Sequence, residues 1–152
     1  MFSARTTLVF ILSILFLSSC NPSDSPQSSG RRTLPAEVDV IINLAAAFNA
    51  HSPERKGEFV HEEIIWYGMY ADTFVVEANG RDHLLTSMAG YFKSLPSARS
   101  KMESITPSGG YVAVRERAYW TSKDGEKSQA SLAVYEVKEN KVSRVWYFPA
   151  CE

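Results

Sequence analysis

The fold is decided by residues Tyr111–Phe148, which have the sequence YVAVRERAYWTSKDGEKSQASLAVYEVKENKVSRVWYF. Its β-branched and aromatic residues fall into three runs, at 111–121, 129–138 and 142–148. Between the runs, Asp124-Gly125 and Glu139-Asn140 are residue types that accept the backbone conformations of tight hairpins. The stretch therefore predicts an antiparallel meander of three strands.

Upstream of the meander, apolar residues recur at helical spacing after Pro35, and Ser52-Pro53-Glu54 is a second helix start. A third helix begins at Gly80 and is stopped by Pro96. The remaining apolar runs are predicted to be strands, at 64–69, 73–76 and 98–106. Helices gathered on one side of an antiparallel sheet make an α+β domain.

Composition excludes several classes of protein. The 152 residues are 45% hydrophobic and 22% charged, which is typical of a globular domain and not of a disordered, collagenous or polytopic membrane protein. The formal charge of −1 and the pI near 6.3 predict no basic surface for nucleic acid. A single domain is expected at this length.

The N-terminus has the pattern of an export signal. Arg5 supplies a positive charge, and Leu8–Leu17 is an apolar segment too short for a bilayer core, which needs about 20 residues. Residues 1–19 are therefore predicted to be a signal peptide. The ending Leu17-Ser18-Ser19-Cys20 resembles the bacterial lipobox, which implies that Cys20 becomes the acylated, palmitate-bearing first residue of a lipoprotein.

Acylation would leave Cys20 unable to form the disulfide with Cys151 that an exported chain otherwise suggests. Asn21–Arg32 is rich in Ser, Pro and Gly and lacks aliphatic and aromatic residues, so 20–33 is predicted to be a flexible linker. In the lipoprotein resemblance, an aspartate at the position of Asn21 would mark inner-membrane retention. We therefore expect the periplasmic face of the outer membrane in a bacterial cell envelope.

Three local motifs carry a resemblance to a known family. They are Phe59-Val60-His61-Glu62-Glu63, Ala78-Asn79-Gly80-Arg81-Asp82 and Val142-Ser143-Arg144-Val145-Trp146-Tyr147-Phe148. With the element order, they resemble the SnoaL-like branch of the nuclear transport factor 2 superfamily, and we assign residues 34–152 to this domain. The resemblance implies a cone-shaped α+β fold, with three N-terminal helices packed on a curved, mainly antiparallel sheet around a conical pocket.

Aromatic residues are numerous enough to line such a pocket, although each one alone is more typical of a core. The candidates for ligand binding are Trp66, Tyr70, Phe74, Tyr91, Trp120 and Trp146. As a set they favour a small apolar or aromatic ligand.

Alternation in the strand after Gly110 singles out Glu116. Val112, Val114, Glu116, Ala118 and Trp120 share one face of that strand. If this face lines the pocket, desolvation raises the pKa of Glu116 and makes it a candidate general acid or base. The alternative is that Glu116 pairs with a basic residue of an adjoining strand or lies where the sheet meets water.

Arg115 and Arg117 would then lie on the convex face, which in this superfamily commonly forms a dimer. The run Ala130–Val137 is largely apolar on both faces, so a homodimer is expected. The alternative register turns the two arginines inward, toward an anionic ligand.

Enzymes that resemble this fold use aspartates as catalytic bases, and this sequence lacks them. The strand segment Ile64–Tyr67 contains no acid, and the only aspartate of the meander, Asp124, is a turn residue. His51, His61 and His83 have no metal-ligand spacing, so neither a metal nor a cofactor is predicted. Three hypotheses remain: an anchored small-molecule-binding or accessory module, a cofactor-independent isomerase, cyclase or hydratase using Glu116, and a structural envelope protein.

Overall fold

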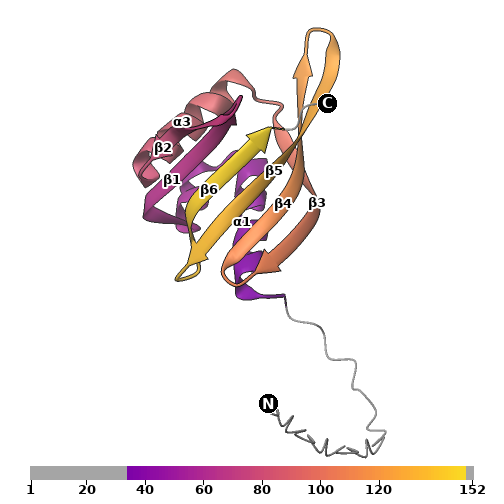
Figure 1. Ribbon diagram of the computed structural model, residues 1–152. Coiled ribbons are helices and arrows are strands. Elements are labelled where there is room, and N and C mark those ends of the chain that lie inside the picture. The colour runs from indigo at the N-terminus through magenta and orange to yellow at the C-terminus, as the bar shows by residue number, and fades with distance from the viewer. Residues whose placement is uncertain (1–33, 150–152) are drawn as a thin grey trace, which may run out of the picture. The chain divides into compact units, whose positions relative to one another are not determined.

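In residues 34–149, the part of the chain that the computed structural model describes, six strands form one sheet in the order β2-β1-β6-β5-β4-β3. Three helices cover one face of this curved sheet (Figure 1). Neighbouring strands are antiparallel except β1 and β6, which are parallel. The fold class is therefore α+β, as the sequence predicts, and the sheet is mixed because of this one parallel pair.

The meander is confirmed as β4 (Tyr111–Ser122), β5 (Gly125–Lys138) and β6 (Lys141–Pro149). Glu139 and Asn140 have φ of 50° and 58°, the left-handed conformation that a two-residue hairpin turn requires. Strand β5 begins four residues earlier than predicted, because its first residues are polar and carry no apolar signal.

The first hairpin consists of β1 (Val60–Tyr70) and β2 (Thr73–Asn79), and β3 is Arg99–Ser108. Strand β1 starts at Val60, which lies beside Val142 of β6, so His61-Glu62-Glu63 belongs to the strand and not to its entry. Helix α3 (Arg81–Ser94) follows this hairpin. Only two helices therefore precede the sheet, which corrects the expectation of three N-terminal helices.

Helices α1 (Ala36–Asn49) and α2 (Pro53–Glu58) begin at the predicted signals. The Ser52 side chain accepts a hydrogen bond from the Arg55 backbone N–H at 3.3 Å, which caps α2. Helix α1 buries Ile41 and Leu44 in the main core cluster of the domain, which Val112 and Val145 of the sheet also join. Helix α1 contacts β3 to β6, α3 contacts β1 and β2, and α2 packs between the other two helices.

The predictions for residues 1–33, including the signal peptide, the acylation of Cys20 and the linker, lie outside the described residues, as does Cys151. Within residues 34–149, no helix has both the length and the apolar character needed to cross a membrane.

Candidate functional site

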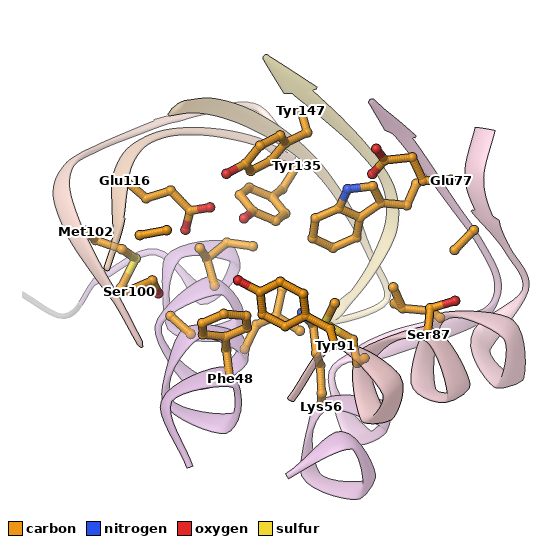
Figure 2. Close-up of a pocket in the computed structure, with 18 of the residues that line it drawn as sticks. Phe48, Lys56, Glu77, Ser87, Tyr91, Ser100, Met102, Glu116, Tyr135 and Tyr147 are labelled. Atoms are coloured by element: carbon orange, nitrogen blue, oxygen red, sulfur yellow. The ribbon is translucent and has the colours of Figure 1, made fainter. Parts of the chain in front are cut away.

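A cavity of about 490 Å³ lies between the concave face of the sheet and the helices. Side chains from all three helices and all six strands line it, and most of them are apolar or aromatic (Figure 2). The larger aliphatic and methionine side chains on its wall are Ile41, Leu44, Leu84, Met88 and Met102. This volume and composition are typical of a small-molecule site.

Glu116 lies on the cavity wall in the middle of β4, between Met102 of β3 and Ser131 of β5. No ion pair to its carboxylate is found within residues 34–149. Burial raises the pKa of Glu116, while the Lys56 charge and then hydrogen bonding by the hydroxyls of Tyr147 and Ser131 lower it. Glu116 thus lies on the face that the sequence predicts, and no basic partner from an adjoining strand is found among the described residues.

Three phenols point toward Glu116 in Figure 2, from Tyr91, Tyr135 and Tyr147. Burial raises the pKa of each phenol, to about 12 for Tyr147, and the Glu116 charge raises it further. All three therefore stay protonated at neutral pH and present hydroxyl donors to the carboxylate or to a ligand oxygen.

Lys56 enters the cavity from α2 and is 4% exposed. Its Nζ lies 5.0 Å from the centroid of the Trp66 ring, 5.4 Å from that of Phe48 and 3.4 Å from Met88 Sδ. No carboxylate within the described residues lies within 4.0 Å of it. Burial lowers the pKa of Lys56 to about 8, an effect that Glu116 partly opposes.

Tyr70 and Glu77 line the other end of the cavity. Figure 2 shows Glu77 well separated from Glu116. The Tyr70 hydroxyl donates to Glu77 Oε1 at 2.6 Å, and because Tyr70 is 58% exposed this pair lies at the opening. Gly68 makes room for the pair, since a Cβ at that position would collide with the Glu77 carboxylate.

Three of the six aromatic residues predicted to bind ligand line the cavity, namely Trp66, Tyr70 and Tyr91. Phe74 and Trp146 lie instead on the opposite, convex face, each in aromatic contact with Tyr67. Trp146 must face away because its neighbours Val145 and Tyr147 face inward and a strand alternates. Trp120 shares the face of Glu116 but lies nearer the end of β4, beyond the lining residues found in 34–149.

Arg115 and Arg117 both face away from the cavity, and each donates to a different Glu103 oxygen at 2.8 Å. The alternative register with inward arginines is thereby excluded. A surface ion-pair cluster of this kind explains both arginines without a ligand.

The sequence prediction missed Tyr147 and Glu77 on the cavity wall, and it also missed Lys56. Lys56 stands in the charged segment Pro53–Glu58, which resembles a solvated helix. The single usable signal is the adjacent Gly57, whose missing side chain lets α2 approach Leu85 of α3, where a Cβ would lie 3.0 Å from Leu85 Cδ1. A glycine in so short a helix marks close packing on that side.

Within residues 34–149, no group of three or more His, Cys, Asp or Glu side chains is arranged to hold a metal ion. The polar end of the cavity instead offers a carboxyl group with a raised pKa, an amine with a lowered pKa and three phenols. These groups can exchange protons with a bound molecule and donate hydrogen bonds to its oxygens.

Comparisons with known proteins agree with this architecture. An uncharacterized cystatin-fold protein from Novosphingobium aromaticivorans has 20% identity and a TM-score of 0.66, covering 76% of this chain and 99% of its own. IdmH, a putative polyketide cyclase from Streptomyces antibioticus, has 17% identity and a TM-score of 0.64, covering 74% and 91%. An NTF2-like protein of unknown function from Cytophaga hutchinsonii has 12% identity and a TM-score of 0.60, covering 78% and 94%.

At these identities the solved structures show a shared fold. No curated protein matches the chain. A model of the SnoaL-like domain matches residues 41–145, which include every element except the first turn of α1 and the last residues of β6. The chain therefore belongs to the SnoaL-like domain family, with the cone-shaped fold of the nuclear transport factor 2-like proteins.

Proposed function

We propose that this domain binds a small, mainly apolar or aromatic molecule that carries at least one oxygen. The observation that supports this most strongly is the open cavity of about 490 Å³, which is apolar along most of its wall and has Glu116 and Lys56 among its few charged groups. Such a cavity takes the apolar body of a ligand by the hydrophobic effect and orients it through a few polar groups.

A substitution that fills the cavity with a large side chain tests this proposal. Ala118 lies on the cavity wall, whereas Ala113 of the same strand points to the opposite face. With 2-methoxynaphthalene as a fluorescent probe, Ala118→Phe should weaken binding to the purified full chain about tenfold or more, and Ala113→Phe should not. Equal affinity in both variants would mean that the probe binds elsewhere, and the absence of binding to the wild type would refute the proposal.

A second function is favoured by one observation, the raised pKa of Glu116 in a cavity where its carboxylate has no ion-pair partner within residues 34–149. In this function Glu116 removes a proton beside a carbonyl group of the bound molecule and returns it to another atom, as an isomerase or cyclase requires. The protonated phenols of Tyr135 and Tyr147 and the Lys56 ammonium stabilise the negative charge that develops on the carbonyl oxygen. One of the structural neighbours is a putative polyketide cyclase.

The second function predicts exchange of the α-protons of 2-tetralone for deuterium in D₂O, followed by NMR. Glu116→Gln should slow this exchange on the order of 10²-fold or more, because the amide cannot accept the proton. Glu77→Gln is the matched control, since it removes a carboxylate from the other end of the same cavity. Equal exchange in the wild type and Glu116→Gln would rule out the base.

The setting of the domain is also part of the proposal. Acylation of Cys20 would hold it on the periplasmic face of the outer membrane, where it would act as a binding or accessory module. Two copies would pair through their convex faces, where Phe74 and Leu132 are 42% and 46% exposed in this chain. Intact-mass analysis of membrane-extracted protein tests the acylation of Cys20. The absence of an acyl mass on Cys20 would contradict the anchor.

A further inference from the structure

The amine of Lys56 is placed where a bound molecule can reach it. Lys56 lines the cavity, and in Figure 2 its side chain runs from α2 toward the cavity centre. Its Nζ is in contact with the rings of Trp66 and Phe48 and with Met88 Sδ, none of which is a strong hydrogen-bond acceptor. The amine is therefore buried without, among the residues that the structure describes, the carboxylate partner that usually accompanies a buried lysine.

This environment increases the fraction of neutral amine. With a pKa of about 8 instead of 10.5, about half of Lys56 is unprotonated at pH 8, which is on the order of 100-fold more than for a solvated lysine. A neutral amine is the nucleophilic form, and desolvation in an apolar pocket is a known way to activate it. Solvent-exposed lysines such as Lys93 on α3 lack this buried, apolar environment.

The cavity also supplies a group that can act as acid and base in a reaction of the Lys56 amine. Glu116 interacts electrostatically with Lys56, and its raised pKa lets it hold a proton closer to neutral pH than an ordinary carboxyl group. The phenols of Tyr91 and Tyr135 lie beside Glu116 and can donate to an oxygen formed nearby.

We propose that Lys56 forms a Schiff base with an apolar or aromatic aldehyde or ketone held in the cavity. This inference rests on the proposed function, because the carbonyl compound must first bind between the rings of Phe48 and Trp66. It adds a reaction that Glu116 alone cannot perform, and it restricts the ligand class to compounds with an unhindered carbonyl group.

The step is balanced by the groups present. The Lys56 nitrogen lone pair attacks the carbonyl carbon, and the carbonyl π electrons move to the oxygen, which takes up the proton released by the nitrogen to give a carbinolamine. Glu116 then donates a proton to the hydroxyl group, which leaves as water while the nitrogen lone pair forms the C=N bond. The proton lost from nitrogen restores Glu116, so the amine and the carbonyl compound become an imine and water.

Reductive trapping tests the inference. The full chain is treated at pH 8 with 2-naphthaldehyde and sodium cyanoborohydride, which reduces an imine to a stable secondary amine. We expect intact-mass and peptide analysis to find one naphthylmethyl group, on Lys56, formed on the order of tenfold or more faster than at any solvent-facing lysine. The trapping rate should increase with pH and level off above about pH 8.

Three variants make the result specific. Lys56→Arg keeps the charge and Lys56→Met keeps the apolar stem, and both should abolish the fast adduct. Lys93→Met, the matched control on an exposed helical position, should retain it. Binding of 2-methoxynaphthalene, which has no carbonyl group, is measured in parallel for all variants.

The outcomes separate the two proposals. If 2-methoxynaphthalene binds but the aldehyde gives no adduct, or gives adducts spread evenly over the surface lysines, the Schiff base is refuted and the binding function stands. If neither compound binds, both are refuted. A fast adduct that survives in Lys56→Met would also overturn the inference.

Discussion

Replacing Lys56 by methionine is expected to stabilise this protein at neutral pH. The side chain is 4% exposed, and its pKa of about 8 shows that the fold disfavours the charged form. A pKa lowered from 10.5 to about 8 corresponds to about 3 kcal/mol at about 1.36 kcal/mol per pKa unit. Lost cation–π contacts with Phe48 and Trp66 offset about 1 kcal/mol of this gain, which leaves a stabilisation of about 2 kcal/mol.

The sign of the pH dependence follows from linkage. Between pH 8 and 10.5 the unfolded chain still binds the proton that the folded Lys56 has released, so the stability of the wild type rises with pH in this window. Below pH 8 both states are protonated and the full penalty remains. The advantage of Lys56→Met should therefore be largest at pH 7 and should decrease by about 2 kcal/mol by pH 10.5.

Urea unfolding followed by tryptophan fluorescence measures this difference at pH 7 and pH 10, with Lys93→Met as the control for loss of an exposed charge. Because each comparison is between a variant and the wild type at one pH, the titration of other groups largely cancels. A Lys56→Met variant that is less stable than the wild type at pH 7 would refute the reasoning, because it would mean that the ammonium is held by a strong ion pair.

Three further predictions concern other parts of the fold. Hydrogen bonds from Lys138, and then from Ser143 and Arg144, lower the pKa of the Glu136 carboxyl group to about 2. The wild type should therefore lose stability as the pH falls from about 4.5 to 2, and Glu136→Gln should lose less stability over the same range in acid unfolding monitored by circular dichroism. Leu132→Asp on the convex face should convert the proposed dimer to a monomer in sedimentation velocity, and an already monomeric wild type would contradict that interface. Gly68→Ala should turn the Glu77 carboxylate away from the Tyr70 hydroxyl and so lower the raised pKa of the Tyr70 phenol in an NMR titration, whereas an unchanged pKa would show that the pair persists.

Alternation predicted the position of Glu116 because β4 pairs with β5 from Tyr111 to Ser122 without a register shift. A period of two is then enough to place every side chain of that strand on a face. The same rule places Trp146 on the convex face, once Tyr147 is taken to face the cavity. Counting aromatic residues without assigning them a face is what led to the wrong expectation for Trp146 and Phe74.

Other features depend on tertiary structure that local patterns do not encode. Trp66 pairs with Ala78 and Tyr67 with Val76, so the extra residue of a β-bulge is Glu77 in β2, and alternation does not predict that the adjacent Glu77 and Ala78 both line the cavity. Lys56 is buried only because α2 is held between α1 and α3, and a charged segment of six residues gives no apolar periodicity from which to predict this. The position of Lys56 in the site therefore required the structure.

The central claim is that the cavity binds a small aromatic molecule, and methionine methyl groups test it most directly. Met88 and Met102 line the cavity, whereas Met69 pairs with Phe74 and lies outside the cavity lining of the described residues. In a methyl NMR titration of the full chain with 2-methoxynaphthalene, the signals of Met88 and Met102 should shift in a saturable way while that of Met69 stays in place. A shift confined to Met69, or no saturable shift at all, would contradict the account.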